Sequence, residues 1–172
     1  MIELKHINHG NWIECIELEA GEGQNQFVSP NIFSLAEAYV HSEANKLEAE
    51  KYYRCIPFAI YSDNKMIGFT MLTYEKENDF DNKPSYEIYR LMIAKNDQGK
   101  GFGKEVIKQL LDYIKTFPYG EADYVYASWH PDNGASARIC LANGFMVVGE
   151  DEEDGAVISR LAIKLNSSKD KN

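Results

Sequence analysis

The chain is poor in cysteine and shows no pattern of metal ligands. Among its 172 residues, only Cys15, Cys55 and Cys140 carry thiols. An odd number of widely separated cysteines fits neither a disulfide framework nor a C-x-x-C metal site. We expect Cys15 and Cys55 to be reduced and buried. The four histidines have no metal-ligand spacing either, so the sequence predicts no bound metal.

Long hydrophobic runs and an excess of positive charge are also lacking. No apolar run approaches the roughly 18 residues that a membrane-spanning helix needs, and residues 1–7 alternate in polarity instead of forming a signal-peptide core. The 18 basic and 27 acidic residues leave a net charge of -9. We therefore expect a cytoplasmic protein without a membrane or nucleic-acid partner. The acidity can attract a cationic substrate, or it can serve solubility alone.

The polarity pattern predicts a mixed α/β domain. A hydrophobic content of 44% and a charged content of 26% are typical of soluble globular proteins. Strands are expected over residues 2–7, 57–61, 66–75, 86–94, 124–129, 145–149 and 156–165, and helices over 11–19, 33–42, 104–115 and 134–143. The charged segment 45–53 is expected to be a surface connection or a helix. This order predicts helices packed on one largely antiparallel sheet.

Three glycines lie within five positions at the turn between the strand 86–94 and the following helix. The segment reads Gln98-Gly99-Lys100-Gly101-Phe102-Gly103. Glycine lets a backbone approach a bound group closely. The first turn of the helix presents free N–H groups and the positive end of its dipole. Together these features predict an anion site for a phosphate or pyrophosphate.

Two common phosphate-binding motifs do not fit this loop. A nucleotide-binding P-loop needs G-x-x-x-x-G-K-[ST], and no Lys-Ser/Thr pair stands in that register. The dinucleotide fingerprint G-x-G-x-x-G belongs to a βαβ unit. Here the glycines are spaced differently and follow a meander of strands.

The pattern Gln-x-x-Gly-x-Gly after Leu91-Met92-Ile93 resembles the acetyl-CoA loop of the GNAT acetyltransferase superfamily. A second segment, residues 133–145, reads NGASARICLANGF and resembles that family's N-x-x-[AS]-x-x-[FL]-Y-x-x-x-G-F. The segments 27–31, 34–38 and 90–93 are similar to those of bacterial spermine/spermidine (diamine) N-acetyltransferases. The resemblance implies a GNAT fold of the α/β (α+β) class, with a mixed, mostly antiparallel central sheet splayed at the cofactor strand. It also implies one domain over residues 1–165, followed by a polar tail over 166–172.

The resemblance assigns the residues that would bind the cofactor, acetyl-CoA. Backbone groups of residues 91–93 would hold the pantetheine arm like an added strand, and N–H groups of residues 99–104 would bind the pyrophosphate. Gln98 would close the loop, and Lys100 would either add charge or stay solvated. Asn133 would contact the cofactor and also cap its helix. The expected cofactor-binding set is Leu91, Met92, Ile93, Gln98, Gly99, Lys100, Gly101, Phe102, Gly103, Lys104, Asn133 and Ser136.

The implied reaction is acyl transfer, in which a neutral amine attacks a thioester and a thiolate leaves. Because alkyl amines have a pKa of about 10, the acceptor must lose a proton. Glu87 matches the catalytic glutamate of the family's histone acetyltransferase branch, although strand alternation alone leaves its direction open. Cys140 stands where the second motif has its tyrosine acid. A thiol with a pKa of about 8.5 can protonate a leaving thiolate, or Cys140 is a small core residue.

The acceptor implied by the closer resemblance is a polyamine, which is a small cationic amine. Carboxylates and aromatic faces recognise such cations, and the candidates are Glu37, Glu75 and Tyr74. One alternative is another amine acceptor, such as an amino acid, an aminoglycoside or a protein N-terminus. A second is a CoA-binding sensor with little turnover. A homodimer is a possible assembly, because many related proteins dimerise.

Overall fold

The computed structural model describes residues 1–47 and 53–163. Its elements in chain order are β1 (Ile2–His6), α1 (Trp12–Glu17), η1 (Gln24–Gln26), α2 (Asn31–Leu47), β2 (Tyr53–Ser62), β3 (Lys65–Glu75), β4 (Ser85–Ile93), η2 (Lys95–Asp97), α3 (Phe102–Ile114), β5 (Tyr124–Trp129), α4 (Gly134–Ala142), β6 (Met146–Glu150) and β7 (Val157–Ala162). The seven strands form one sheet in the order β1-β2-β3-β4-β5-β7-β6. All neighbouring strands are antiparallel except β4 and β5, which run parallel. The predicted α/β class with a mostly antiparallel sheet is confirmed.

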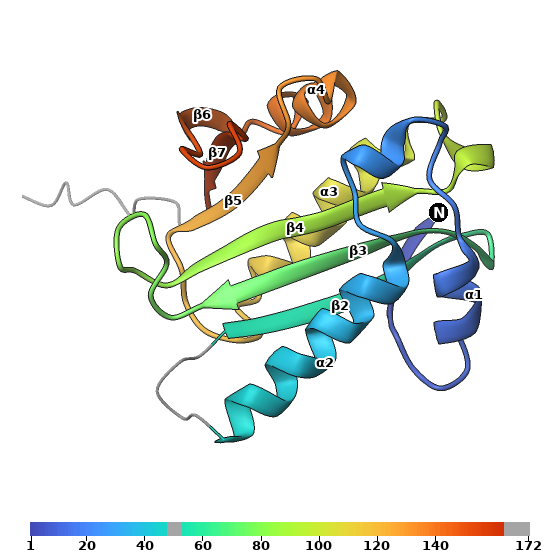
Figure 1. Ribbon diagram of the computed structural model, residues 1–172, viewed down its shortest axis with the longest axis horizontal. Helices are drawn as coiled ribbons and strands as arrows, with labels where there is room; N and C mark the ends of the chain where they lie inside the picture. Colours follow the sequence, from blue (N-terminus) through green and yellow to red (C-terminus); the bar gives the residue numbers. More distant parts are fainter. Residues whose placement is uncertain (48–52, 164–172) are drawn as a thin grey trace, which may run out of the picture.

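Helices cover both faces of this sheet (Figure 1). On one face, α3 packs the apolar stripe of residues 106–114 onto the strands. On the other face, α1 contributes Cys15 and α2 contributes Ala38 to a second core, which includes Phe69 and Met92 of the sheet. Successive residues of a strand point to opposite faces, so every strand between these layers feeds both cores. Each large apolar side chain that is fully buried contributes about 1.5–3 kcal/mol.

The parallel strands β4 and β5 pair only at their beginnings. Residues 85–87 of β4 are in register with residues 124–126 of β5, and the pairing between these two described strands ends there. Both strands continue beyond that point, β4 to Ile93 and β5 to Trp129, and they diverge visibly in Figure 1. The sheet is therefore splayed at the strand that precedes the glycine turn, as expected.

A β-bulge changes the direction of side chains along β4. Met71 of β3 is opposite Arg90, whereas the next residue, Leu72, is opposite Ile88. Tyr89 is the extra residue of the bulged strand. Consequently Tyr89 and Arg90 both reach the face covered by α2, where Tyr89 packs in the core and Arg90 pairs with a carboxylate of α2.

Two elements extend past their predicted bounds. The helix α2 runs to Leu47 and takes in part of the charged segment 45–53; the remainder of that segment, residues 48–52, lies outside the described residues. The strand β2 begins at Tyr53 and passes through Pro57, although proline predicts a strand start there. β1 pairs with β2 only from Phe58 onward. Pro57 therefore lies where β2 is an edge strand, which tolerates proline.

The predicted tail, residues 166–172, lies outside the described residues, and the domain boundary at residue 165 stays a prediction. Within the part of the chain that the structure describes, no helix combines the length and the apolar character needed to cross a bilayer.

Candidate functional site

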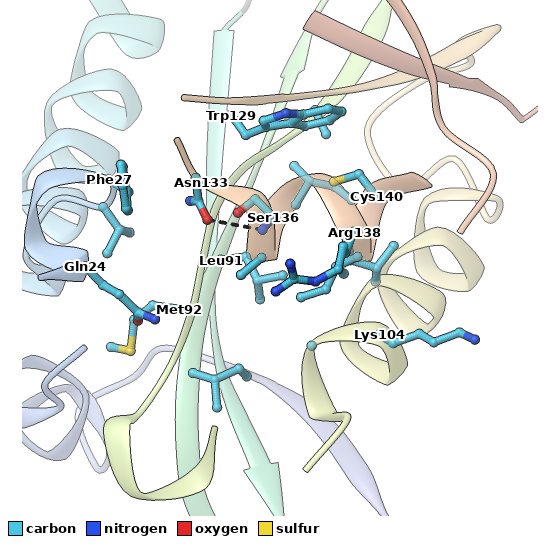
Figure 2. A pocket seen from close by; sticks show the side chains of 18 of the residues that line it. Gln24, Phe27, Leu91, Met92, Lys104, Trp129, Asn133, Ser136, Arg138 and Cys140 are labelled. Atoms are coloured by element: carbon cyan, nitrogen blue, oxygen red, sulfur yellow. Dashed lines mark hydrogen bonds between the residues drawn. The ribbon is translucent and has the colours of Figure 1, made fainter. Parts of the chain in front are cut away.

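A cavity of about 510 Å³ opens where β4 and β5 part. The segment before α2 forms one wall, with Gln24, Phe27 and Val28. β4, the glycine turn and the start of α3 line the floor, and α4 forms the opposite wall. Figure 2 shows Gln24 and Phe27 across the cavity from Asn133, Ser136 and Cys140, with Leu91 and Met92 of β4 between the two walls. Segments far apart in the sequence thus enclose one space.

The glycine turn has the shape of an open anion cradle. Gly99 and Gly101 have φ values of 76° and 82°, which lie in the left-handed region that glycine adopts at low cost. A Cβ added at either residue would meet nothing within 4 Å. The turn is therefore open to a ligand on the side where side chains would stand. Gly101 is also the N-cap of α3 and supplies no side-chain cap, so the first N–H groups of α3 remain available to an anion.

A third glycine of the turn has a packing role. A Cβ at Gly103 would lie 2.8 Å from Cδ1 of Ile139 on α4. The absence of a side chain at Gly103 lets α3 and α4 approach each other at the base of the cavity. Phe102 beside it is half-buried and lines the same cavity.

The charge of Lys100 is partly neutralised by its own loop. Its Nζ donates to Oδ1 of Asp97 at 2.8 Å and to the carbonyl of Asn96 at 3.0 Å. Asp97 also accepts a hydrogen bond from Lys65. These two hydrogen bonds, from Lys100 first and Lys65 second, lower the pKa of Asp97. Lys100 thus helps to fix the turn, and it is not one of the residues that line the cavity.

Arg138 is a cationic lining residue that the sequence analysis missed. It belongs to α4 and lines the cavity together with Lys104 of α3. Figure 2 shows the guanidinium of Arg138 turned toward β4, whereas the ammonium of Lys104 points away from the cavity. A guanidinium has the shape and charge to bind a phosphate oxygen. Arg138 lies within the second sequence motif, but the family pattern assigns no role to its position, and only the fold shows that it lines the cavity.

The start of α4 is fixed by its capping residue. Asn133 Oδ1 accepts from the backbone N–H of Ser136 at 3.1 Å, and both residues line the cavity. Cys140, one helical turn further on, is 6% exposed and packs in the core against α3 while its edge lines the cavity. Burial raises the pKa of its thiol to about 11. The thiol is therefore protonated at neutral pH and is a weak proton donor.

Two carboxylates lie side by side on the face of the sheet covered by α2. Glu87 is opposite Thr73, and Glu75 is opposite Ser85, so Glu75 and Glu87 are diagonal neighbours. Burial, and then the charge of Glu87, raise the pKa of Glu75 to about 7. Burial also raises the pKa of Glu87, and a hydrogen bond from Ser128 partly offsets that shift. Ser128 Oγ lies 3.4 Å from Glu87 Oε1 and itself lines the cavity, which places Glu87 one side chain behind the cavity wall.

A third carboxylate, Glu37 of α2, is held by β4. Tyr89 donates its hydroxyl to Glu37 Oε1 at 3.0 Å, and Arg90 Nη2 lies 3.7 Å from Glu37 Oε2. The guanidinium of Arg90 also stacks over the Tyr89 ring at 3.9 Å. Tyr89 and Arg90 line the cavity, whereas Glu37 stands behind them. Glu37 therefore orients two lining residues, and its own charge is compensated by Arg90.

Tyr74 requires a correction to the expected grouping with Glu37 and Glu75. The Tyr74 side chain is 4% exposed in the core on the α3 face, where its ring contacts Tyr86 at 4.8 Å. Glu75 is its neighbour along β3, and neighbouring strand residues point to opposite faces. The sheet therefore separates Tyr74 from the two carboxylates. An aromatic pair does lie on the carboxylate side, where Phe80 stacks on Tyr126 with ring centroids 4.8 Å apart.

Among the described residues, the arrangement combines an anion cradle and an unpaired strand edge, which line one cavity, with a half-buried acidic pair, whose Glu87 lies behind the cavity wall. The cradle and Arg138 suit a diphosphate, and the edge of β4 offers backbone groups to an extended chain. The half-buried pair of Glu75 and Glu87 offers a base and a site for a cation. Within residues 1–47 and 53–163, no cluster of His, Cys, Asp and Glu side chains is arranged to hold a metal ion.

Sequence comparison shows that this chain is similar to known acetyltransferases. The family described as "Acetyltransferase (GNAT) domain" matches residues 18–146. A probable spermine N(1)-acetyltransferase of Bacillus subtilis subsp. natto is 26% identical over 155 residues, which cover 90% of this chain and 93% of that protein.

Comparison with solved structures finds the same fold. Spermidine N-acetyltransferase from Vibrio cholerae, in complex with CoA and spermine, has a TM-score of 0.62 and 16% identity, covering 94% of this chain and 95% of that one. An aminoglycoside acetyltransferase in complex with coenzyme A has a TM-score of 0.70 and 16% identity, covering 94% and 95% of the two chains. At these identities the likeness concerns the fold.

The acidic pair predicts a pH-dependent effect of Glu75→Gln on stability. The pKa of Glu75 rises from 4.5 to about 7 on folding, so the folded state binds more protons than the unfolded state between these values. The contribution of Glu75 to the free energy of unfolding is therefore present at low pH and is lost as pH rises through 7. We expect wild type and variant to melt at similar temperatures at about pH 5, and the variant to melt at a higher temperature at about pH 8.

Melting curves by circular dichroism at both pH values measure this difference. Glu77→Gln, at an exposed loop position just beyond β3, serves as the control and should show no such pH dependence. A difference in melting temperature between Glu75→Gln and wild type that stays constant with pH would contradict the raised pKa of Glu75.

Proposed function

The chain belongs to the GNAT acetyltransferase family, and we propose that it transfers an acetyl group from acetyl-CoA to a primary amine of a small cationic acceptor, with a polyamine such as spermidine or spermine favoured. The observation that supports this most directly is the half-buried pair Glu75 and Glu87, of which Glu87 lies behind Ser128 in the wall of the cavity where β4 and β5 part. Two like charges held as neighbours in a partly desolvated place favour a cationic ligand, which relieves their repulsion.

The residues around the glycine turn suit the cofactor. The open side of Gly99 and Gly101 and the N–H groups at the start of α3 would bind the diphosphate. Arg138 would add a charge-assisted contact to a phosphate. Residues 91–93 would bind the pantetheine arm through their backbone, because none of the described strands pairs with this part of β4 on that side. When bound, acetyl-CoA supplies the acyl group as a thioester.

Glu87 is the proposed base for the acceptor amine. Its raised pKa brings its basicity closer to that of a neutral-pH catalyst. Ser128 stands between Glu87 and the cavity, so the proton would pass through this hydroxyl or a water beside it. The ammonium form of the acceptor first gives one proton to Glu87 and becomes the neutral nucleophile. As its nitrogen forms the new C–N bond and the C–S bond breaks, the nitrogen loses a second proton and the departing sulfur gains one.

Cys140 is the candidate donor of that second proton. Its thiol is protonated at neutral pH and lines the cavity. A pKa of about 11 makes it a weaker acid than an ordinary thiol, so its contribution to the rate is small. This weakness is also the feature that fits the second candidate function, a CoA-binding sensor with little turnover.

The acceptor would lie on the face of the sheet covered by α2. Glu75 and Glu87 would pair with its ammonium groups, and the Phe80–Tyr126 stack offers an aromatic face close by. Glu37 would act indirectly, by orienting Tyr89 and Arg90. The positive charge of Arg90 in the lining would limit how many ammonium groups fit and where they bind.

We expect Gly101→Trp to abolish CoA binding without unfolding the protein. The indole would fill the open side of the turn, and the loss of two charge-assisted hydrogen bonds at about 1.5–3 kcal/mol each raises the Kd by at least about 100-fold. Isothermal titration with CoA measures the Kd. Gly155→Trp is the matched control, because Gly155 has a similar φ of 72° in the turn between β6 and β7. Equal CoA affinity in the two variants would contradict the proposal that the glycine turn binds the diphosphate.

We expect Glu87→Gln to lower kcat/KM by about 100-fold at neutral pH, in line with loss of a general base. The deficit should narrow as pH rises, because a larger fraction of the amine is then already neutral. A pH–rate profile of both proteins measures this. Glu3→Gln, an exposed glutamate on the edge strand β1, is the control. A profile of Glu87→Gln that runs parallel to that of wild type would exclude Glu87 as the base.

An amine panel tests the proposed acceptor. Purified protein is mixed with acetyl-CoA and spermidine, spermine, an aminoglycoside or a free amino acid, and released thiol is followed. We expect kcat/KM for the polyamines to exceed that for the amino acid by at least about tenfold. This ratio corresponds to one additional favourable interaction of about 1.4 kcal/mol with the acidic pair. Preference for the aminoglycoside would reassign the acceptor. Tight CoA binding with no thiol release from any amine would favour the sensor, and absence of CoA binding would overturn the whole proposal.

A further inference from the structure

The loop before α2 is fastened to the glycine turn by a pair of glutamines. Gln98 Nε2 donates to Gln24 Oε1 at 2.7 Å, and Gln24 Nε2 donates back to Gln98 Oε1 at 3.1 Å. Gln98 Nε2 also donates to the carbonyl of Ile93 at 2.8 Å, at the end of β4. Gln24 Oε1 in turn accepts from the backbone N–H of Gly21 at 3.2 Å. The two side chains therefore link residues 74 positions apart in the sequence.

The packing around this pair requires a glycine. A Cβ at Gly21 would lie 2.9 Å from Gln98 Oε1 and 3.1 Å from Gln24 Cδ. Both values are shorter than ordinary contacts of a Cβ atom. The backbone of Gly21 thus approaches the glutamine pair so closely that any side chain would displace it.

The same loop forms one wall of the cavity. We call residues 21–28 the strap. Gln24, Phe27 and Val28 of the strap line the cavity, and the Phe27 ring lies 5.6 Å from the ring of His130, on the opposite wall (Figure 2 shows Phe27 and Gln24 on their side of the cavity). A second link ties the chain just before the strap to the turn: Lys95 pairs with Glu19 through its side chain and its backbone N–H.

We propose that the Gln24–Gln98 pair is a positioning device that makes the acceptor-side wall depend on the cofactor-binding turn. The inference rests on the proposed function, because it takes the turn as the diphosphate site and the strap as a wall of the acceptor site. A bound diphosphate holds the turn in one conformation, the turn holds the Gln98 side chain, and Gln98 holds the strap. Binding of CoA thereby orders the wall against which the acceptor binds.

Such a link is an energetic coupling between two ligands. Couplings of this kind change affinity by about 5–150-fold, and the change is the same in both directions. Gln24 touches the turn and not the reacting atoms, so it acts through Gln98 and the strap. Its loss should weaken the effect of CoA on the acceptor more than it weakens the binding of CoA itself.

Hydrogen exchange of the strap tests the coupling without an acceptor. The backbone N–H groups of Gln24, Phe27 and Val28 donate within the strap, so their exchange reports its order. We expect CoA to slow exchange of a peptide spanning residues 20–30 by at least about fivefold in wild type. In Gln24→Ala the slowing should fall below about twofold, while the Kd of CoA by calorimetry changes by less than about threefold.

Two further variants keep the test specific. Gln26→Ala removes an exposed glutamine of the same short helix and should behave as wild type. Gly21→Ala keeps both glutamines in the sequence, but its added Cβ would push their side chains apart. Its exchange rates with CoA should therefore match those of Gln24→Ala. Equal protection of the strap in wild type and Gln24→Ala, or none in wild type although CoA binds, would overturn the coupling while leaving the proposed function intact. Failure of CoA to bind wild type would instead overturn the proposed function.

Steady-state kinetics give a second readout. With spermidine as acceptor, Gln24→Ala should raise the KM for the amine by about tenfold and change kcat by less than about threefold. A merely structural defect would lower kcat and stability together. An unchanged KM for spermidine in Gln24→Ala would overturn the coupling.

Discussion

The parting of β4 from β5 is the constraint on which the site depends. After three residue pairs the strands separate, which leaves a strand edge and a cavity at the centre of the sheet. Open edges in a sheet interior are costly unless something satisfies their backbone groups. The glycine turn, α4 and the strap surround this edge and leave space for one extended ligand. The fold thus maintains a local defect in its sheet, and this defect is the proposed binding site.

The sheet divides the work of the site between its faces. The anion cradle and Arg138 belong to the side of α3 and α4, whereas Glu75 and Glu87 point to the side of α2. Because of the bulge, Tyr89 and Arg90 both point to the α2 side, whereas strict alternation would place only one of these two neighbours there. In the proposed function, the negative and positive groups of the two ligands would therefore bind on different faces, and the cavity between the strands would connect them. This separation keeps the acidic pair away from the diphosphate, which it would repel.

The strap forms the wall of this cavity on the proposed acceptor side. It lies far from the glycine turn in sequence, and its own helical turn is too short to be stable alone. Its position comes from the glutamine pair, from the ion pair of Glu19 with Lys95, and from Val28 in the second core. Polar links of this kind break more easily than a packed core, so the strap is the part of the wall that a ligand can order.

The sequence alone predicted the α/β class, the glycine turn, the capping of α4 by Asn133 and the family, because each of these is written in neighbouring residues: periodicity, turn chemistry and two short motifs. It also predicted the splay, through the family resemblance. Which side chains share a face was decided by the tertiary structure. Tyr74 and Glu75 are adjacent in the chain yet lie on opposite sides of the sheet, whereas Gln24 and Gln98 are far apart and exchange hydrogen bonds. The physical reason is that strand register, a single-residue bulge and loop packing depend on contacts between distant segments, and a local pattern contains no information about those distances.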